Sequence, residues 1–547
     1  MPLIQTRLSD LILDGARAAQ RADALPAFDL PDKAPITRNK DARWGDFSSS
    51  LAMQVTRSAA RKPLEVAQII QQHLPQVDLV SDTSVSPPGF INMTLSAGWL
   101  AEQVDTILSA GPHFADLDLG QNQKAQVEFV SANPTGPLSV GRGRGGVIGD
   151  TMANLLSAVG YSVTREYYFN NAGNQMRDLG TSLQLRYLQA LGQEVEFLDR
   201  LYQGEYLVDL GQQIATERGA TLANEDWETF KDIAEAAMFE SIKKTLARIN
   251  IYMDIFFNEN SLYEDGSVWE VLDLLRQKGY IYEKDGAQWF ETTKLSGLED
   301  RVLVKSTREP TYRLPDIAYH RNKLERGYQL IIDVLGADHK DSFPDVIRGV
   351  EALGYNASGI KLLMNQFVTV KGERMSTRAG RFTLLDELID DVGADVVRFF
   401  MLMRAADTHL EFDLELAREQ SEKNPVYYVQ YAHARISSIL RKAAEKGFSG
   451  EGGDVSLLVH PGEQNLIRQL LHLSEVIFQS FQELAPHHLT TYARDLASTF
   501  HAFYRDCLVL DPEQPELSRA RLKLVTATRT GLARTLELLG VAAPETM

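Results

Sequence analysis

The sequence SANPTGPLSVGRGRGGVIGD, residues 131–150, decides the expected fold. It joins a short apolar run at 127–130 to a helical pattern at 146–159, and a second strand pattern follows at 162–169. A strand, a glycine-rich loop, a helix and a strand in this order indicate one βαβ unit of a parallel sheet. Ligands of such sheets bind beyond the carboxyl ends of the strands. We therefore expect an α/β domain with its ligand at this loop.

The loop also has the composition of an anion-binding site. Its glycines, at 136, 141, 143, 145 and 146, let the backbone approach a ligand closely. The free N–H groups of a following helix attract phosphate, and Arg142 and Arg144 add permanent positive charge. We expect nucleotide phosphate here, and the alternative is a glycine-rich surface turn with solvated arginines. The loop lacks the sequence GxxxxGK[ST], so it is not a P-loop.

Length, charge and cysteine content restrict the class of protein. A chain of 547 residues is too long for one core and predicts three or four domains. The net charge of −18 argues against a protein that coats nucleic acid nonspecifically, but it allows a local basic face. The one cysteine, Cys507, excludes an intramolecular disulfide and a zinc site built on several cysteines. Its apolar surroundings favour a buried thiol over a nucleophile.

The N-terminal residues predict an amphipathic helix that carries acidic side chains, which is not the pattern of a signal peptide. No stretch approaches 18 consecutive apolar residues, so we expect no membrane span. The expected location is the cytoplasm.

We expect three domains, at 1–112, 113–395 and 396–547. The first combines helical patterns with short strands such as FINMTL, residues 90–95, and the last has apolar residues spaced three and four apart, as in packed helices. A polar, glycine-containing stretch at 111–124 predicts a linker.

The middle domain contains further strand candidates at 329–335 and 366–370. A long, mostly helical insertion at about 180–294 separates them from the first two strands. A second basic loop follows the last candidate strand, where VTVKGERMSTRAGRF occupies residues 368–382. Its cations, Lys371, Arg374, Arg378 and Arg381, favour a second phosphate site over a solvated basic turn.

The sequence VEFVSANPTGPL, residues 127–138, followed by SVGR, resembles the start of the catalytic domain of arginyl-tRNA synthetases. The resemblance continues through WGDFSSSLAMQVTRSAARKPLEVAQII near the N-terminus and NPVYYVQYAHARISSIL near the C-terminus, so it spans almost the whole chain. It implies a Rossmann-like class I synthetase catalytic domain, an α+β N-terminal domain that contacts tRNA, and an all-α C-terminal anticodon-binding domain.

The family's HIGH tetrapeptide, whose histidines assist the ATP phosphates, corresponds here to Ser139, Val140, Gly141 and Arg142. Both histidine positions are therefore replaced. A serine donates one hydrogen bond without charge, whereas Arg142 is always charged and can bind a phosphate bidentately. Loss of one transition-state donor commonly costs about 10²–10³ in rate.

The basic loop resembles the family's KMSK loop, with Arg374, Met375, Ser376 and Thr377 in the four places and Arg378 next. Thr377 replaces the usual second lysine, and Lys124 is the candidate for a compensating lysine. The resemblance thus implies these catalytic residues: Ser139, Arg142, Arg374, Ser376, Arg378 and Lys124.

A guanidinium substrate needs carboxylates that accept paired N–H bonds. The resemblance assigns the substrate arginine to Ser131, Asn133, Gln175, Glu259, Tyr312 and Asp316. Considered alone, Asp316 is better explained as a helix N-cap, Tyr312 as a core aromatic and Glu259 as an exposed acid, and it is their joint match to the family that favours the substrate site. The family's NDAG sequence is NNAG here, so Asn171 replaces an aspartate.

The resemblance also implies residues for the other two substrates. The ATP site consists of Pro137, Leu138, Gly141, Gly143, Gly336, Asp338, His339 and Met375. The tRNA-binding residues are Asn424, Tyr428, Tyr431 and Arg435. An aromatic and basic helix face suits unstacked bases, and the alternative is ordinary helix packing.

The implied function is ATP-dependent ligation of L-arginine to tRNA(Arg) through an arginyl-adenylate. ATP is a substrate that brings Mg²⁺, no metal bound by the protein itself is expected, and the protein is expected to be a monomer whose partners are tRNA(Arg), arginine and ATP. The alternative is a catalytically impaired or repurposed paralogue that binds tRNA or arginine without efficient charging. A third hypothesis, transfer of arginine to a small molecule, conflicts with the C-terminal domain.

Overall fold

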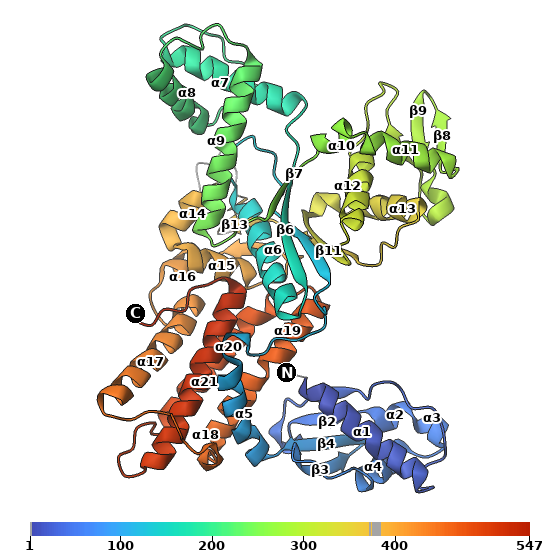
Figure 1. Cartoon of the computed structure of the whole chain (residues 1–547), viewed down its shortest axis with the longest axis vertical. Coiled ribbons are helices and arrows are strands. Elements are labelled where there is room, and N and C mark those ends of the chain that lie inside the picture. Colours follow the sequence, from blue (N-terminus) through green and yellow to red (C-terminus); the bar gives the residue numbers. More distant parts are fainter. Residues whose placement is uncertain (1–2, 371–372, 375–383) are drawn as a thin grey trace.

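The computed structural model describes residues 3–370, 373–374 and 384–547. Figure 1 shows a central α/β body with a helical bundle and the N-terminal domain at one end and two inserted units at the other. This arrangement confirms the expected fold class of an α/β catalytic domain between an α+β domain and an all-α domain.

The N-terminal domain packs helices on an antiparallel four-stranded sheet of order β1-β2-β4-β3. Strand β4 occupies the predicted residues, and its alternate buried side chains include Ile91, Met93 and Leu95. The elements are α1 (Ile4–Arg21), β1 (Ile36–Arg38), β2 (Phe47–Ser49), α2 (Leu51–Gln54), α3 (Thr56–Ala59), α4 (Pro63–Gln72), β3 (Val80–Ser86) and β4 (Phe90–Leu95).

The central sheet has five parallel strands in the order β12-β11-β5-β6-β7. The chain runs outward from β5 to β6 and β7, then returns to place β11 on the other side of β5. The change of direction between β5 and β11 is a topological switch point, where parallel sheets bind ligands. The strands are β5 (Lys124–Glu128), β6 (Ser162–Phe169), β7 (Ile255–Asn258), β11 (Leu330–Gly336) and β12 (Ile360–Asn365).

Helix α6 (Val140–Ala158) links β5 to β6 and begins six residues before the predicted start. The apolar period begins only at Val147, because the first two turns are mostly glycine and arginine. Ser139 caps the helix, since its hydroxyl accepts a hydrogen bond from the Arg142 N–H at 3.4 Å. The tetrapeptide 139–142 is therefore the N-terminus of the helix itself.

The predicted insertion at about 180–294 is interrupted by a strand of the central sheet. Helices α7 (Asn174–Ala190), α8 (Glu205–Arg218) and α9 (Trp227–Arg248) form a helical unit with its own apolar core. Strand β7 then rejoins the sheet, and its four residues are too few to show a strand period in the sequence. After it come α10 (Asn260–Glu264), α11 (Ser267–Gln277) and a small antiparallel sheet of β8 (Ile281–Lys284), β9 (Ala287–Phe290) and β10 (Arg301–Val304).

Two more helices, α12 (Arg313–Glu325) and α13 (Phe343–Leu353), flank β11. The strand predicted at 366–370 appears as β13 (Val368–Val370), but it pairs with β14 (Glu373–Arg374) and β15 (Leu410–Phe412) in a separate sheet. It is therefore not a sixth strand of the central sheet.

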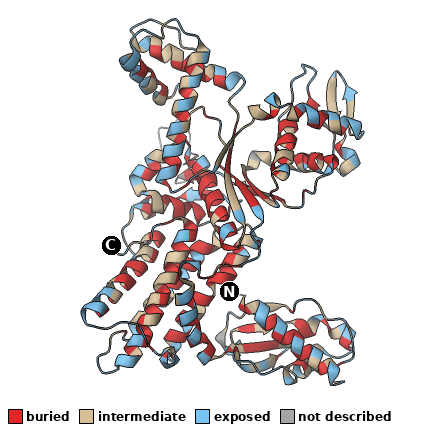
Figure 2. Ribbon diagram, viewed as in Figure 1, coloured by how far each residue is buried: buried red, intermediate tan, exposed pale blue. Residues whose placement is uncertain are grey.

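The C-terminal region is a helical bundle whose cores are continuous with that of the α/β body (Figure 2). Helix α5 (Ala97–Ala110), which the predicted boundary at 112 assigns to the first domain, packs on α18 and α21 of this bundle. Cys507 is buried in the bundle, as expected for a structural thiol. The helices are α14 (Leu385–Val392), α15 (Ala394–Leu402), α16 (Leu414–Arg418), α17 (Pro425–Glu445), α18 (Pro461–Leu471), α19 (Leu473–Gln482), α20 (His488–Asp506) and α21 (Pro515–Leu539).

Among the described residues, no helix combines the length and the apolar character that a membrane crossing requires.

Arg398 of α15 ties the bundle to the α/β body. Its side chain is 1% exposed and donates to the carbonyls of Leu539 and Ile249 and to the carboxylate of Asp150 at 2.8, 2.7 and 2.6 Å. We expect Arg398→Met to lower the stability by about 3–5 kcal/mol, because it leaves the buried carbonyls of Leu539 and Ile249 without their donor and removes one of the cations that pair with Asp150. Denaturant unfolding of the whole chain measures this, with Arg418→Met of the exposed Arg418–Asp391 pair as control. Equal unfolding curves for the two variants would contradict the assignment.

Candidate active site

A cavity of about 640 Å³ opens at the carboxyl ends of the central strands. Residues from β5, β6, β11 and β12 line it, together with the first turn of α6 and one face of α12. It lies at the switch point beside β5, where the topology predicts a ligand. The cavity has two chemically different halves, one cationic and one acidic.

The cationic half is formed by the N-terminus of α6 and the loops after β11 and β12. Ser139, Gly141 and Arg142 line it, and the η4 turn (Ala337–His339) faces them. A cation in the first turn of a helix opposes the helix dipole, so the position of Arg142 is unfavourable until an anion binds. The remaining lining residues of this half are Gly145, Gly336, Ala337, His339, Asn365, Gln366 and Phe367.

The backbone turns sharply where β5 meets the loop. Val130 and Ser131 both have positive φ, 67° and 40°, which is costly for a β-branched residue such as valine. The turn directs the Val130 carbonyl toward α6, where it accepts a hydrogen bond of 3.1 Å from the Arg142 guanidinium. Strain of this kind persists where a site requires a fixed geometry.

Several residues predicted for the nucleotide have other roles. Arg144 is fully buried and donates to the carbonyls of Gln366, Thr408 and Ala405, so it is not a phosphate ligand. Burial lowers its pKa to about 10. Arg142 is therefore the arginine of this loop that faces the cavity.

Gly143, Leu138 and Lys124 also differ from expectation. A Cβ on Gly143 would lie 2.7 Å from the Leu385 side chain, so this glycine permits helix packing rather than ligand approach. Leu138 is buried, and its carbonyl accepts from the Leu385 N–H at 2.8 Å. Neither these two residues nor Pro137 lines the cavity. Lys124 is the first residue of β5, at the end of the strand opposite the cavity, and its ammonium donates to the Arg326 carbonyl, which does not fit a role in place of a loop lysine.

The acidic half contains two carboxylates that point inward. Glu259, at the end of β7, accepts hydrogen bonds from the Tyr168 hydroxyl at 2.7 Å and from the Asn170 amide at 2.9 Å. Asp316 lies in the first turn of α12, four positions after the N-cap residue Tyr312, so it is not the N-cap. Both carboxylates line the cavity.

Desolvation makes the charged form of these carboxylates unfavourable, so that pairing with a cation stabilises them. Burial raises the pKa of Asp316 to about 7, and the nearby Glu259 and Glu128 act in the same direction. Burial also raises the pKa of Glu259 above its ordinary value. A bound guanidinium would relieve this cost by pairing with the charged carboxylates.

Asn133 connects this half to the helical unit. Its carbonyl oxygen accepts from the Asn170 N–H, and its amide donates to the Gln175 side chain, both at 3.0 Å. Asn133 lines the cavity, whereas Gln175 supports it from outside. The Ser131 hydroxyl also lines the cavity, but it already donates to Glu128 and accepts from the Tyr168 N–H.

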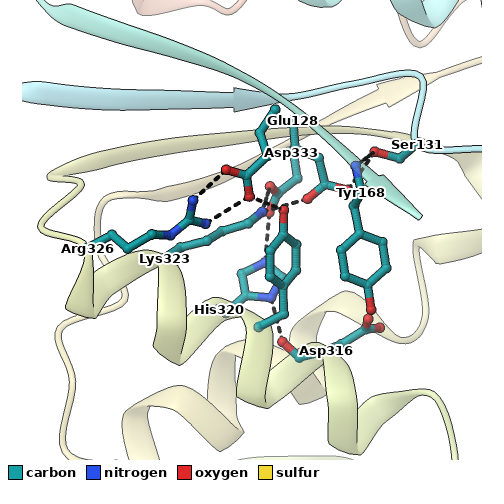
Figure 3. A network of polar contacts seen from close by, with 10 residues as sticks. Glu128, Ser131, Tyr168, Asp316, His320, Lys323, Arg326 and Asp333 are labelled. Atoms are coloured by element: carbon teal, nitrogen blue, oxygen red, sulfur yellow. Dashed lines mark hydrogen bonds and ion pairs between the residues drawn. The ribbon is translucent and has the colours of Figure 1, made fainter. Parts of the chain in front are cut away.

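A buried ionic network lies beneath the acidic half (Figure 3). The Lys323 ammonium, which is 0% exposed, donates to Glu128 and Asp333, each at 2.6 Å. Asp333 also bonds the His320 ring at 2.8 Å, and the other nitrogen of that ring lies 2.7 Å from the Asp316 carbonyl. Burial alone would raise the pKa of Asp333, but Lys323 and His320 hold it well below its ordinary value.

A second groove, of about 660 Å³, lies on the helical bundle. Tyr428, Tyr431 and Arg435 of α17 line it, and the Arg435 guanidinium lies 4.6 Å from the Tyr504 ring centroid. The rings of Tyr427 and Tyr431 are stacked at 6.3 Å. The groove thus presents exposed aromatic faces beside a cation.

Asn424 does not belong to this surface. It is 2% exposed and caps α17, since its side-chain oxygen accepts from the Val426 N–H at 3.1 Å. Its amide donates to the carbonyls of Ala417 and Glu419. Every polar group of the side chain is therefore occupied within the fold, and the expected contact to RNA is wrong.

Comparison with known proteins assigns all three parts of the chain. The model of the arginyl tRNA synthetase N terminal domain matches residues 7–95, that of the tRNA synthetases class I (R) catalytic domain matches 103–405, and that of the DALR anticodon binding domain matches 429–547. The arginine–tRNA ligase of Pelodictyon phaeoclathratiforme is 47% identical over 528 residues, 94% of this chain and 96% of the relative. The chain belongs to the arginyl-tRNA synthetase family.

Other similarities agree with this assignment. The arginine–tRNA ligase of Desulfotalea psychrophila is 47% identical over 94% of this chain and 95% of its own. The solved arginyl-tRNA synthetase of Thermus thermophilus shares the fold, with a TM-score of 0.78 over the full length of both chains at 23% identity.

The arginyl-tRNA synthetase motifs are only partly described by the structure. Met375, Ser376, Thr377 and Arg378 of the KMSK-like loop lie outside the described residues, as do Lys371 and Arg381, and the side chains of Arg374 and Asp338 are likewise not described. Tyr312 is 58% exposed and does not line the cavity, so it is neither a core aromatic nor a pocket residue here. Its ring stacks on the Arg313 guanidinium at 5.0 Å instead.

The sequence interpretation missed several cavity residues. Tyr168 lies near the end of β6, Asn170 follows that strand, Glu128 ends β5, and Asp333 lies in the middle of β11. For the first three, the position at the carboxyl end of a predicted parallel strand was the available signal. Among the residues that the structure describes, no group of three or more His, Cys, Asp or Glu is arranged to hold a metal ion.

We expect Lys323→Met to destabilise the catalytic domain by about 3–5 kcal/mol or more, because it leaves Glu128 and Asp333 buried without a cation. Thermal and urea unfolding measure the loss. Lys361→Met, at an exposed position on the same sheet, is the matched control. Adding Glu128→Gln and Asp333→Asn removes the unpaired charges and recovers part of the stability. A triple variant no more stable than Lys323→Met would contradict this electrostatic account.

Proposed function

We propose that the protein ligates L-arginine to tRNA(Arg) in two steps. The arginine carboxylate attacks the α-phosphorus of ATP, which forms arginyl-adenylate and releases pyrophosphate. A ribose hydroxyl at the 3′ end of the tRNA then attacks the adenylate carbonyl, which forms the ester and releases AMP. The observation that carries this proposal is the division of one cavity into an acidic half and a cationic half, which matches a guanidinium at one end and phosphates at the other.

The acidic half binds the amino acid. Glu259 and Asp316 accept the guanidinium N–H groups, and the Tyr168 hydroxyl and Asn170 amide fix the orientation of Glu259. Asn133, held by Gln175, faces the part of the cavity that receives the amino and carboxyl groups. Catalysis here consists mainly of placing the carboxylate in line with the phosphate.

The cationic half binds ATP. The N–H groups of the first turn of α6 and the Arg142 guanidinium stabilise phosphate charge, while Gly336 and His339 line the wall opposite them. Arg374, Ser376 and Arg378 of the KMSK-like loop supply further contacts in this proposal. ATP enters as its Mg²⁺ complex, in which its phosphates hold the ion, because Glu128 and Asp333 already bind Lys323.

The tRNA lies across the bundle, where Tyr428, Tyr431 and Arg435 receive unstacked bases. Aromatic faces stack on any base, and Arg435 adds attraction for phosphate or a base edge. The working unit in this proposal is a monomer.

Arginine charging of tRNA by the purified protein tests the proposal. We expect charging, and we expect Arg142→Ala to lower kcat about 10²–10³-fold, because Arg142 replaces the charge that the two absent histidines supply in relatives of the usual pattern. Arg142→Lys keeps the charge but loses the planar fork and is expected to fall between the two. Arg17→Ala, at an exposed position on α1, is the control.

Pyrophosphate exchange with and without tRNA accompanies the charging assay. A protein that binds tRNA or arginine but does not charge at high concentration would support the impaired-paralogue alternative. Full activity in Arg142→Ala would show that the helix N–H groups suffice.

The pKa of Asp316, about 7, predicts a pH-dependent arginine affinity. A guanidinium binds the ionised carboxylate, so rising pH increases the competent fraction roughly tenfold between pH 6 and 8. We expect KM for arginine to fall by about that factor while KM for ATP changes little. In Asp316→Asn, KM for arginine is high and independent of pH in this range. If KM for arginine still depends on pH in Asp316→Asn, the titrating group is not Asp316.

A further inference from the structure

Three segments meet beside the acidic half through one asparagine. The Asn171 amide donates to the Glu235 carboxylate of α9 at 2.9 Å, and its carbonyl oxygen accepts from the Asn260 amide at 3.1 Å. Asn171 follows β6, and Asn260 begins α10 directly after Glu259. Asn171 is half-buried and uses both ends of its side chain.

The neighbouring bond runs in parallel. Asn170 donates to the Glu259 carboxylate, so residues 170–171 are joined to residues 259–260 by two adjacent hydrogen bonds. One of these links ends on the carboxylate that faces the cavity, and the other continues to the helical unit of α7, α8 and α9. A shift of α9 therefore acts on the loop that holds Glu259.

The helical unit contacts the cavity loops at two further points. The Tyr206 hydroxyl of α8 donates to the Thr135 carbonyl at 2.6 Å, and Gln175 of α7 accepts from Asn133. The contact through Gln175 continues by way of Asn133 and the Asn170 backbone N–H. The contact through Asn171 instead joins the α9 side chain of Glu235 to Asn260, the residue next to Glu259.

We propose that Asn171 is a positioning residue, which couples the helical unit to Glu259 and so sets the affinity for the guanidinium substrate. The proposal rests on the proposed arginine site. In this chain an amide, rather than the family's aspartate, complements both partners, because Glu235 only accepts and the Asn260 amide donates. An aspartate would still accept from Asn260, but it would place a second carboxylate against Glu235.

The charge change Asn171→Asp tests this coupling. We expect KM for arginine to rise about tenfold or more, because a hydrogen bond to a carboxylate is replaced by repulsion. KM for ATP and kcat stay within about threefold. Asn174→Asp, which adds the same charge at an exposed position three residues along, leaves all three values unchanged.

The double variant Asn171→Asp with Glu235→Gln restores complementary groups, because the glutamine amide donates to the new aspartate. We expect KM for arginine to return to within about threefold of the wild type. A general loss of packing would not be reversed in this way, so the recovery distinguishes positioning from structural damage. Asn260→Ala removes only the donor to Asn171 and should raise KM for arginine selectively, which keeps the test open if Asn171→Asp folds poorly.

Isothermal titration of each variant with arginine, beside the charging assay, separates the two proposals. A wild type that neither charges tRNA nor binds arginine overturns both. A functional wild type with an unaffected Asn171→Asp variant overturns the coupling alone, as does a double variant no better than the single one. A rise of both KM values together would also overturn it, because the effect would not be specific to the guanidinium half.

Discussion

The ammonium group of Lys323 lies between the carboxylates of Glu128 and Asp333 and is fully buried. These carboxylates belong to β5 and β11, the two strands on either side of the switch point, while Lys323 belongs to α12. Breaking such a contact leaves an unpaired charge in a low-dielectric interior, which lowers the stability far more than the loss of a surface ion pair does. The contact therefore fixes how α12 is rotated on the sheet, and this rotation turns Asp316 into the cavity.

The same network controls the charge of the acidic half. Glu166 pairs with Arg326 and accepts from the Tyr319 hydroxyl at 2.6 Å, so α12 meets three strand carboxylates along one face. Lys323 and His320 lower the pKa of Asp316, whereas Glu128 and Glu259 raise it along with burial. With burial as the largest contribution, the balance leaves Asp316 near the point of ionisation at neutral pH. In the proposed complex, the guanidinium of the substrate supplies a positive charge that pairs with the ionised carboxylate.

The sequence predicted the elements whose local pattern is strong and failed where only tertiary contacts decide. Strands β4 and β6 have the predicted bounds, and the loop after β5 was correctly placed at the cavity. Arg142 and Arg144 look alike in the sequence, yet Arg142 faces the cavity and Arg144 is buried in the core. The reason is that two residues two positions apart on a helix point in nearly opposite directions.

The errors for Lys124 and Asn424 have the same origin. Lys124 is close to the glycine-rich loop in the sequence, but in space it lies at the other end of β5 from that loop. Asn424 directly precedes Pro425, the first residue of α17, and its side chain caps that helix instead of facing the groove. Glu259 and Asp316 both line the cavity, and their role toward the substrate arginine stays a prediction that came from the family motifs and not from either residue alone.

Ser139 and Arg142 stand where the family has histidines, which changes how the charge of the cationic half responds to pH. Ser139 holds the first turn of α6 through its hydroxyl, and Arg142 is tethered by the Val130 carbonyl, so the charge is fixed in place before a ligand arrives. A histidine at this position would gain and lose its charge near neutrality, whereas an arginine does not titrate there. In the proposed mechanism, the pH dependence of arginine binding comes from the acidic half, where burial raises the pKa of Asp316 to about 7. In this mechanism, Arg142 thus supplies a constant positive charge in the cationic half. Asp316 supplies a negative charge in the acidic half, and the bound substrate itself stabilises that charge.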